Sequence, residues 1–168
     1  MKLAHEIVDF GSEVGYHYEE LSQFIKELKI MSIEDQRYKL DFPRNEFKKN
    51  YCRFCDYIQK KNLSVAAHGD FADRYLGVSN ADIYTKDVEK ELQIPFEAHS
   101  KRIDKHIDAR VEDHLLIEQT TPKVLELISE KIPAILLLTH PRQWKRNTIV
   151  NASDDLRRVI DGIRYRYL

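Results

Sequence analysis

Apolar side chains recur every three or four positions in several parts of the chain, a spacing that places them on one face of an α-helix. The pattern predicts helices over residues 1–10, 21–28, 47–58, 121–128 and 151–167. Gly11 closes the first helix, and Pro43 separates the third from the residues before it. Thr121-Pro122 opens the fourth, because threonine can accept a hydrogen bond from a free N–H and proline in a first turn loses none.

Shorter apolar runs between these segments predict β-strands, over residues 13–18, 63–67, 103–111 and 134–138. In 103–111 the apolar residues fall on alternate positions, as in a half-buried strand, whereas 134–138 is continuously apolar, as in a strand that helices cover on both faces. Strands that alternate with helices favour an α/β fold with parallel strands. Because no repeat or linker interrupts the sequence, we expect one domain over 1–168.

Composition agrees with a folded domain and limits its partners. The chain has 168 residues, of which 42% are hydrophobic and 33% charged, so it can bury a core of ordinary size. Its 27 basic and 28 acidic residues leave a net charge of -1, which supplies no overall field for binding nucleic acid or an anionic membrane. We therefore expect neither partner.

Two features predict a cytoplasmic protein. The longest apolar run, 132–138, is far shorter than the roughly 18 residues that a membrane span needs. The first ten residues carry Lys2, Glu6 and Asp9 and lack the apolar centre of a signal peptide.

Three of the seven histidines, His17, His68 and His140, each stand just past the apolar body of a predicted strand. In parallel α/β folds such positions meet at the carboxyl edge, where ligand sites lie. Three imidazoles brought together there would bind zinc or another divalent ion, or divide into metal ligands and a general acid. The alternative is that each is an ordinary loop histidine or a hydrogen-bonded core histidine.

Two other residue types have both a structural and a functional interpretation. Cys52 and Cys55 are one helical turn apart with Cys55 on the apolar face, which favours a small buried side chain over a metal or redox pair. Trp144, the only tryptophan, is either a platform on which a sugar stacks or a partly buried anchor of its loop.

Three blocks of sequence resemble one family. They are Gly11-Ser-Glu-Val-Gly-Tyr-His-Tyr-Glu-Glu-Leu21, His68-Gly-Asp70 and Leu136-Leu-Leu-Thr-His-Pro-Arg-Gln-Trp144. Their order and spacing resemble the polysaccharide deacetylase superfamily (NodB homology, carbohydrate esterase family 4), in particular a divergent branch common beside bacterial surface-polysaccharide genes. The resemblance implies a distorted (β/α) barrel in which a divalent metal, usually zinc, activates water to remove an N-acetyl or O-acetyl group from a sugar.

The resemblance also implies roles for single residues. His17 matches the first histidine of the family's metal motif, and His140 matches the histidine that protonates the leaving amine. Leu21 stands where the second metal-binding histidine would be, and no Asp-Asp pair precedes this region, because the chain begins at what resembles the helix after the family's first strand.

A standard Asp-His-His site therefore cannot be assembled, and other residues must be considered. We hypothesise that His68 replaces a missing metal ligand, with Asp70 or Asp113 as an oxygen donor. Asp70, Arg142 and Trp144 are the residues expected to contact the sugar.

We expect an incomplete distorted (β/α) barrel, shortened at its N-terminus, since a full barrel takes about 250 residues. The expected function is that of a deacetylase-like protein of bacterial surface-polysaccharide metabolism with impaired catalysis. One alternative is an active sugar deacetylase that uses a rearranged His17, His68 and His140 site. The other is a non-catalytic module that binds a saccharide or a partner protein through Trp144 and Arg142. A missing first strand would leave unpaired strand edges, which predicts a homodimer or an N-terminal partner chain.

Overall fold

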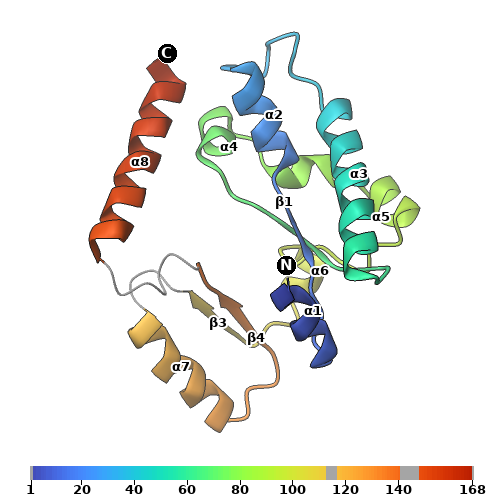
Figure 1. The fold of residues 1–168 in the computed structure, drawn as a ribbon, viewed down its shortest axis with the longest axis vertical. Coiled ribbons are helices and arrows are strands. Elements are labelled where there is room, and N and C mark those ends of the chain that lie inside the picture. The colour runs from blue at the N-terminus through green and yellow to red at the C-terminus, as the bar shows by residue number, and fades with distance from the viewer. Residues whose placement is uncertain (1, 113–116, 141–147, 168) are drawn as a thin grey trace. The chain divides into compact units, whose positions relative to one another are not determined.

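The structure is a computed structural model that describes residues 2–112, 117–140 and 148–167 (Figure 1). Helix and strand make up 53% and 10% of the chain, so the protein is mixed but dominated by helices. Its described part divides into two compact units, one formed by Met1–Ser100 with Tyr165–Leu168 and the other by Lys101–Arg164. We describe each unit by itself, and the single-domain organisation stays a prediction.

The first unit begins with helices and strands close to those expected from the hydrophobic pattern. It contains α1 (Lys2–Asp9), β1 (Tyr16–Tyr18), α2 (Glu20–Leu28), α3 (Asp41–Ile58), β2 (Val65–Ala67), α4 (Phe71–Leu76), the 3-10 helix η1 (Asn80–Ile83) and α5 (Lys86–Glu91). One boundary prediction is wrong. Helix α3 starts at Asp41, so Pro43 lies in its first turn rather than before it. A proline is tolerated there because N–H groups of a first turn have no partner within the helix.

Strands β1 and β2 pair in parallel, with Tyr16 opposite Val65, His17 opposite Ala66 and Tyr18 opposite Ala67. A close approach sets this register. Gly15 packs against Ser64 so tightly that a Cβ at Gly15 would lie 2.9 Å from the Ser64 carbonyl oxygen. The N–H of the next residue, Tyr16, donates a hydrogen bond of 2.9 Å to the same oxygen.

The other edge of β2 is also covered. The N–H of Val65 donates to the Phe96 carbonyl at 3.2 Å, and its carbonyl accepts from the N–H of Ala98 at 2.8 Å. Residues 96–98 thus shield part of an edge of β2 that would otherwise offer free backbone groups to another chain. The expected homodimer or N-terminal partner chain stays a prediction.

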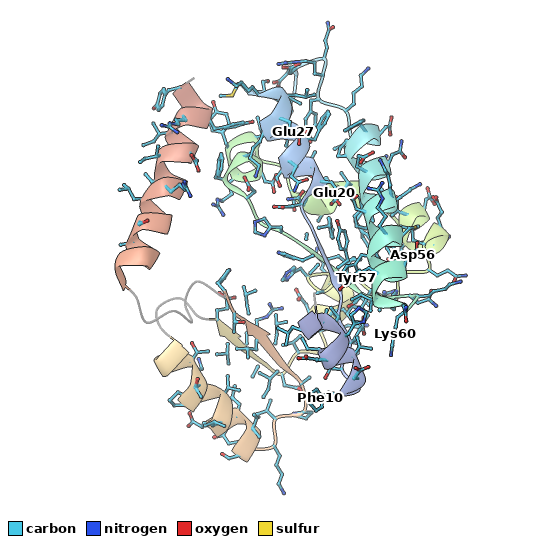
Figure 2. The ribbon with its side chains drawn as sticks, viewed as in Figure 1. Phe10, Glu20, Glu27, Asp56, Tyr57 and Lys60 are labelled. Atoms are coloured by element: carbon cyan, nitrogen blue, oxygen red, sulfur yellow. The ribbon has the colours of Figure 1, made fainter. Side chains whose placement is uncertain are left out.

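The hydrophobic core lies between α2, α3 and the β1–β2 pair. Tyr18 is fully buried and meets Phe47 edge-on, with ring centroids 4.8 Å apart. Phe10, just past α1, is in contrast 89% exposed (Figure 2). The buried core residues are Tyr18, Leu21, Phe24, Ile25, Ile30, Phe47, Tyr51, Cys55, Ile58, Leu63, Val65, Ala72, Ile83, Val88 and Ile94.

The second unit contains α6 (Lys101–Asp104), β3 (Ala109–Glu112), α7 (Ile117–Ser129), β4 (Ile135–Leu138) and most of α8 (Thr148–Tyr167). Strands β3 and β4 pair in parallel from Ala109 opposite Ile135 to Glu112 opposite Leu138. The prediction of a strand over 103–111 is wrong at its start. Ile103 lies in α6, and two turns follow it, closed by bonds from His106 N–H to Ile103 and from Ile107 N–H to Asp104.

Three further expectations for the second unit need correction. Helix α7 begins at Ile117, so Pro122 lies inside it, and α8 begins at Thr148 rather than near Asn151. Strand β4 is not buried on both faces, because Leu137 and Leu138 are 45% and 36% exposed. Among the residues described, β3 is the only strand that pairs with β4.

The described strands form two sheets of two strands each, with orders β1-β2 and β3-β4. All of the pairing is parallel, as an α/β fold requires. The two sheets belong to different units, and the barrel that the resemblance implies stays a prediction. None of the helices described is both long enough and apolar enough to cross a membrane.

Candidate functional site

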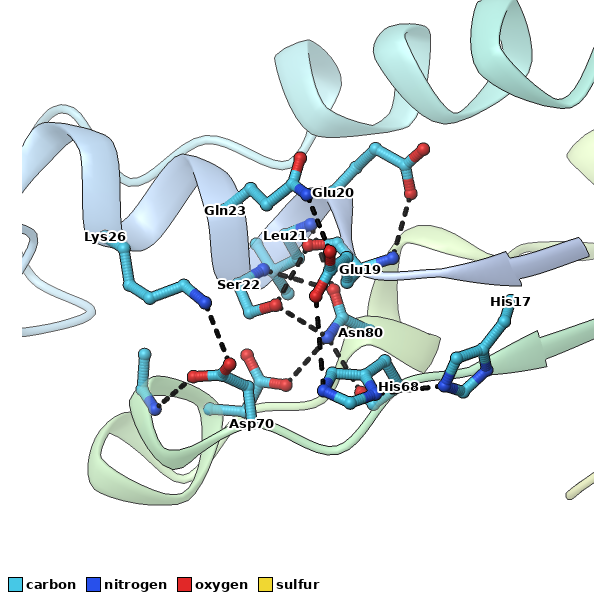
Figure 3. Close-up of polar contacts among 12 residues, drawn as sticks. His17, Glu19, Glu20, Leu21, Ser22, Gln23, Lys26, His68, Asp70 and Asn80 are labelled. Atoms are coloured by element: carbon cyan, nitrogen blue, oxygen red, sulfur yellow. Dashed lines mark hydrogen bonds and ion pairs between the residues drawn. The ribbon is translucent and has the colours of Figure 1, made fainter. Parts of the chain in front are cut away.

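Two of the predicted histidines meet at the end of the β1–β2 pair (Figure 3). His17 is the middle residue of β1, and His68 directly follows β2. Nε2 of His17 lies 2.9 Å from Nδ1 of His68, and Nδ1 of His17 lies 3.0 Å from the carbonyl oxygen of Ala66. The rings cross at 86°, with centroids 5.0 Å apart.

These contacts define which ring nitrogens carry protons. A carbonyl oxygen only accepts, so Nδ1 of His17 donates to Ala66 and its Nε2 is left as an acceptor. Nδ1 of His68 must then donate to Nε2 of His17, so Nε2 is the nitrogen of a neutral His68 that carries the free electron pair. Loss of hydration and then the charge of a protonated His68 lower the pKa of His17, which favours the neutral form of His17.

Two carboxylates lie near the ring of His68. Nε2 of His68 is 4.0 Å from Oε2 of Glu19, and one ligand atom from each of Glu19, His68 and Asp70 lies within 4.8 Å of the other two. Glu19 stands between β1 and α2, and its other oxygen, Oε1, accepts from the side chain of Gln23 at 2.8 Å. The cluster thus lies at the carboxyl ends of two parallel strands, where α/β folds place ligands.

Asp70 has contacts of its own. Its Oδ1 accepts from the N–H of Ala72 at 2.9 Å and caps α4, while its Oδ2 lies 2.8 Å from Nζ of Lys26 on α2. Burial acts to raise the pKa of Asp70, but the hydrogen bonds from Lys26 and Ala72 and the charge of Lys26 outweigh it and hold that pKa below its usual value. Asp70 is therefore ionised at neutral pH.

The side chain of Asn80 caps the N-terminus of α2, although 58 to 59 positions separate them in the sequence. It is fully buried, and its Oδ1 accepts from the N–H groups of Leu21 and Ser22 at 3.0 and 3.1 Å. Glu19, the residue at the start of α2, makes no side-chain cap, so Asn80 supplies the acceptor that a helix N-terminus needs. The backbone next to Glu19 is thereby fixed.

The amide nitrogen of Asn80 reaches the other side of the cluster. Nδ2 lies 2.8 Å from the backbone oxygen of His68 and 2.9 Å from Oδ2 of Asp73 in α4. Asp73 is 3% exposed, and its Oδ1 has no hydrogen-bond partner in the described part of the chain. Burial and then the charge of Asp70 raise the pKa of Asp73 to about 6. One buried amide thus joins the segments that carry Glu19, His68 and Asp70.

The other sequence-predicted site residues fall in the second unit or outside the described residues. His140 is exposed and follows β4 in the second unit. Asp113, Arg142 and Trp144 lie outside the described residues. Leu21, which occupies the position of the family's second histidine, is fully buried in the core.

Sequence reasoning missed Glu19, Lys26 and Asn80. Glu19 had a usable signal, because it directly follows the last residue of the aromatic strand 13–18. Lys26 and Asn80 had none, since their contacts to the site span 44 and 58 to 59 positions.

The cysteine prediction is confirmed for Cys55, which belongs to the core, while Cys52 is exposed. Burial raises the pKa of the Cys55 thiol, so it is not an activated nucleophile. Both cysteines border a separate cavity of about 230 Å³ whose lining includes neither His17 nor His68; it is formed by Tyr51, Cys52, Cys55, Asp56, Lys61, Asn62, Glu91, Leu92 and Gln93.

The cluster fits a divalent cation in its donor set. One imidazole nitrogen with two carboxylates suits zinc and related first-row ions. Ligand atoms on a tetrahedral zinc ion are about 3.4 Å apart for bond lengths of about 2.1 Å, so the 4.0 Å between His68 and Glu19 needs only a small closing movement. Asp70 keeps electron pairs for a cation while it caps α4, because a carboxylate has about four lone-pair positions. His17 has both ring nitrogens engaged and orients His68 instead.

A scan against protein-family models, a search of curated proteins and a search of solved structures each gave no match to the chain. The resemblance to polysaccharide deacetylases and the activity that it implies stay predictions.

Proposed function

We propose that the protein is a polysaccharide deacetylase-like hydrolase whose divalent cation, with zinc the best fit, is held by His68, Glu19 and Asp70. One observation carries the proposal: these three side chains offer ligand atoms within 4.8 Å of one another. The three ligands lie in the blocks 11–21 and 68–70, whose resemblance to the deacetylase family supports a site in this region. The proposal is a form of the active deacetylase with a rearranged site, in which His17 orients His68 and is not a ligand.

The reaction is the addition of water to an acetyl group on a sugar. The water oxygen joins the carbonyl carbon, the bond from that carbon to the sugar nitrogen or oxygen breaks, and the sugar atom takes up a proton as acetate leaves. A bound divalent cation lowers the pKa of water and polarises the acetyl carbonyl.

The chain's own residues have distinct roles in this proposal. Nε2 of His68 would be the ligand atom, and the chain of hydrogen bonds through His17 to the Ala66 carbonyl holds the tautomer in which the proton of a neutral His68 is on Nδ1. Oε2 of Glu19, on a side chain that is 42% exposed, lies 4.0 Å from Nε2 of His68 and would be the second ligand atom. The donor of the proton to the leaving group is assigned to His140 by the resemblance alone.

Acetate release tests the function directly. The full chain, loaded with zinc, is incubated with N-acetylated and O-acetylated oligosaccharides, and free acetate is measured before and after treatment with a chelator. We expect release that depends on the cation, is restored by its return and falls at least about a hundredfold in His68→Ala. His106→Ala is the matched control, because His106 is an exposed histidine of the second unit.

Two results would overturn the proposal. One is acetate release that is equal in His68→Ala and in the parent protein. The other is binding of acetylated saccharides that survives chelation, with no acetate formed, which would favour the non-catalytic binding module.

A further inference from the structure

The positively charged ammonium group of Lys26 occupies part of the proposed cation site. Nζ of Lys26 lies 2.8 Å from Oδ2 of Asp70 (Figure 3). The Asp70 side chain is only 10% exposed, and its other oxygen is committed to the N-terminus of α4. The oxygen that can most readily turn to a cation is therefore the one that Lys26 holds.

Lysine and a divalent ion cannot both bind this oxygen without cost. The charges of the two cations repel, and the repulsion is strong where a carboxylate is shielded from water, because the local dielectric is low. Binding of the ion therefore requires the Lys26 ammonium to withdraw. It can withdraw into solvent, because its side chain is 33% exposed.

We propose that Lys26 is a specificity-determining residue: an internal cation that competes with the divalent ion for Asp70 and so lowers the affinity of the site. The inference rests on the cation site of the proposed function. It predicts that only ions with strong attraction to an imidazole and carboxylates displace the lysine, which favours zinc or cobalt over magnesium and calcium.

The test measures cation affinity rather than activity. Cobalt is titrated calorimetrically into the chelator-treated full chain, as parent protein, Lys26→Met, Lys26→Gln and Lys29→Met. Methionine keeps most of the apolar stem, and glutamine keeps a neutral donor toward Asp70. Lys29→Met removes the same charge from an exposed position one residue past α2.

We expect cobalt to bind about tenfold more tightly to Lys26→Met and Lys26→Gln than to the parent, since a half-buried ion pair must otherwise be broken. Lys29→Met is expected to change affinity less than about twofold, because exposed charges are screened. The melting temperature of each variant without cobalt shows that the fold is retained.

The two proposals fail in different ways. Equal cobalt affinity in the parent and both Lys26 variants would overturn the role of Lys26 and leave the cation site standing. Weaker binding in both variants would also overturn it, since Lys26 would then support the site. Absence of cobalt binding by all four proteins would overturn both the cation site and the inference that rests on it.

Discussion

His17 and His68 are joined ring to ring, with 2.9 Å between Nε2 of the first and Nδ1 of the second, although 51 positions separate them in the sequence. The parallel register of β1 and β2 makes the contact, because it puts His17 opposite Ala66, two residues before His68. The contact has a chemical direction. It begins at the backbone carbonyl of Ala66 and passes through the ring of His17 to Nδ1 of His68, whose other ring nitrogen lies 4.0 Å from Oε2 of Glu19.

Replacement of His17 is expected to weaken the cation site without abolishing it. Loss of the hydrogen bond frees the His68 ring to rotate and to change tautomer, and removal of such an orienting partner costs about 10- to 100-fold in metal affinity. Calorimetric titration of His17→Ala with zinc measures this loss. Complete loss of binding, equal to that of His68→Ala, would instead make His17 a ligand, as the deacetylase motif implies. The control is His106→Ala.

Asn80→Ala is expected to lower the free energy of unfolding by about 2–4 kcal/mol. The substitution removes the acceptor of the buried N–H groups of Leu21 and Ser22. It also removes a hydrogen-bond donor to the carboxylate of Asp73. Urea denaturation followed by circular dichroism measures the change. Asn45→Ala, at an exposed position of α3, should cost less than about 0.5 kcal/mol. Equal midpoints for the two variants would contradict the bridging role of Asn80.

Gly15→Ala is expected to destabilise the first unit by about 1–3 kcal/mol. The new Cβ would meet the side chain and backbone of Ser64 at 2.7 and 2.9 Å, and the backbone cannot yield without disturbing the pairing that starts at Tyr16. Gly69→Ala is the control, because nothing lies within 4 Å of its Cβ position. A thermal melt in which both variants match the parent would show that the register of β1 and β2 is not fixed at this point.

The buried carboxyl of Asp73 makes stability depend on pH. Its pKa is raised to about 6 from the ordinary 3.8, so the folded state binds this proton more tightly than the unfolded state does. Stability from this group is fully present below about pH 4 and is lost as the pH rises through about 6, by about 1–3 kcal/mol.

Asp73→Asn isolates this contribution. The free energy of unfolding of the variant minus that of the parent should rise between about pH 4 and 6 and be level above that range. The contribution of His17 to stability changes with pH in the opposite direction, because its lowered pKa makes stability fall as the pH drops below 6.5. This effect is present in both proteins, so the subtraction removes it. A difference that does not vary with pH would contradict the raised pKa of Asp73.

The hydrophobic pattern predicts the helices and strands of the first unit as far as β2, because these helices have a single apolar face and these strands are short and bounded. It does not predict α4, η1 and α5, which have six, four and six residues and are too short to show an apolar period. Residues 21–28 and 63–67 lie where α2 and β2 are found. The pattern fails at 103–111 for a physical reason. Ile103 and Ile107 are four positions apart, which fits a helical turn as well as alternate positions of a strand.

The meeting of His17 and His68 follows from parallel pairing of strands that precede polar residues, and the sequence predicts it. The ligand set does not follow so directly. Glu19 directly follows the predicted strand 13–18, but a glutamate is also common at a helix start, so its position alone does not distinguish a ligand from a helix-start residue. The contacts of Lys26 and Asn80 arise only when α2, α4 and η1 pack together, and no local pattern encodes them.

The most direct test of the cation site is the stoichiometry of zinc binding to the chelator-treated full chain, measured by calorimetry and by metal analysis after dialysis. The parent protein should bind one zinc ion per chain, and His68→Ala and Glu19→Gln should each lose that binding. Glu27→Gln, on the exposed part of α2, should keep it (Figure 2). A parent protein that binds no stoichiometric zinc, or that binds it equally well after loss of His68, would contradict the account.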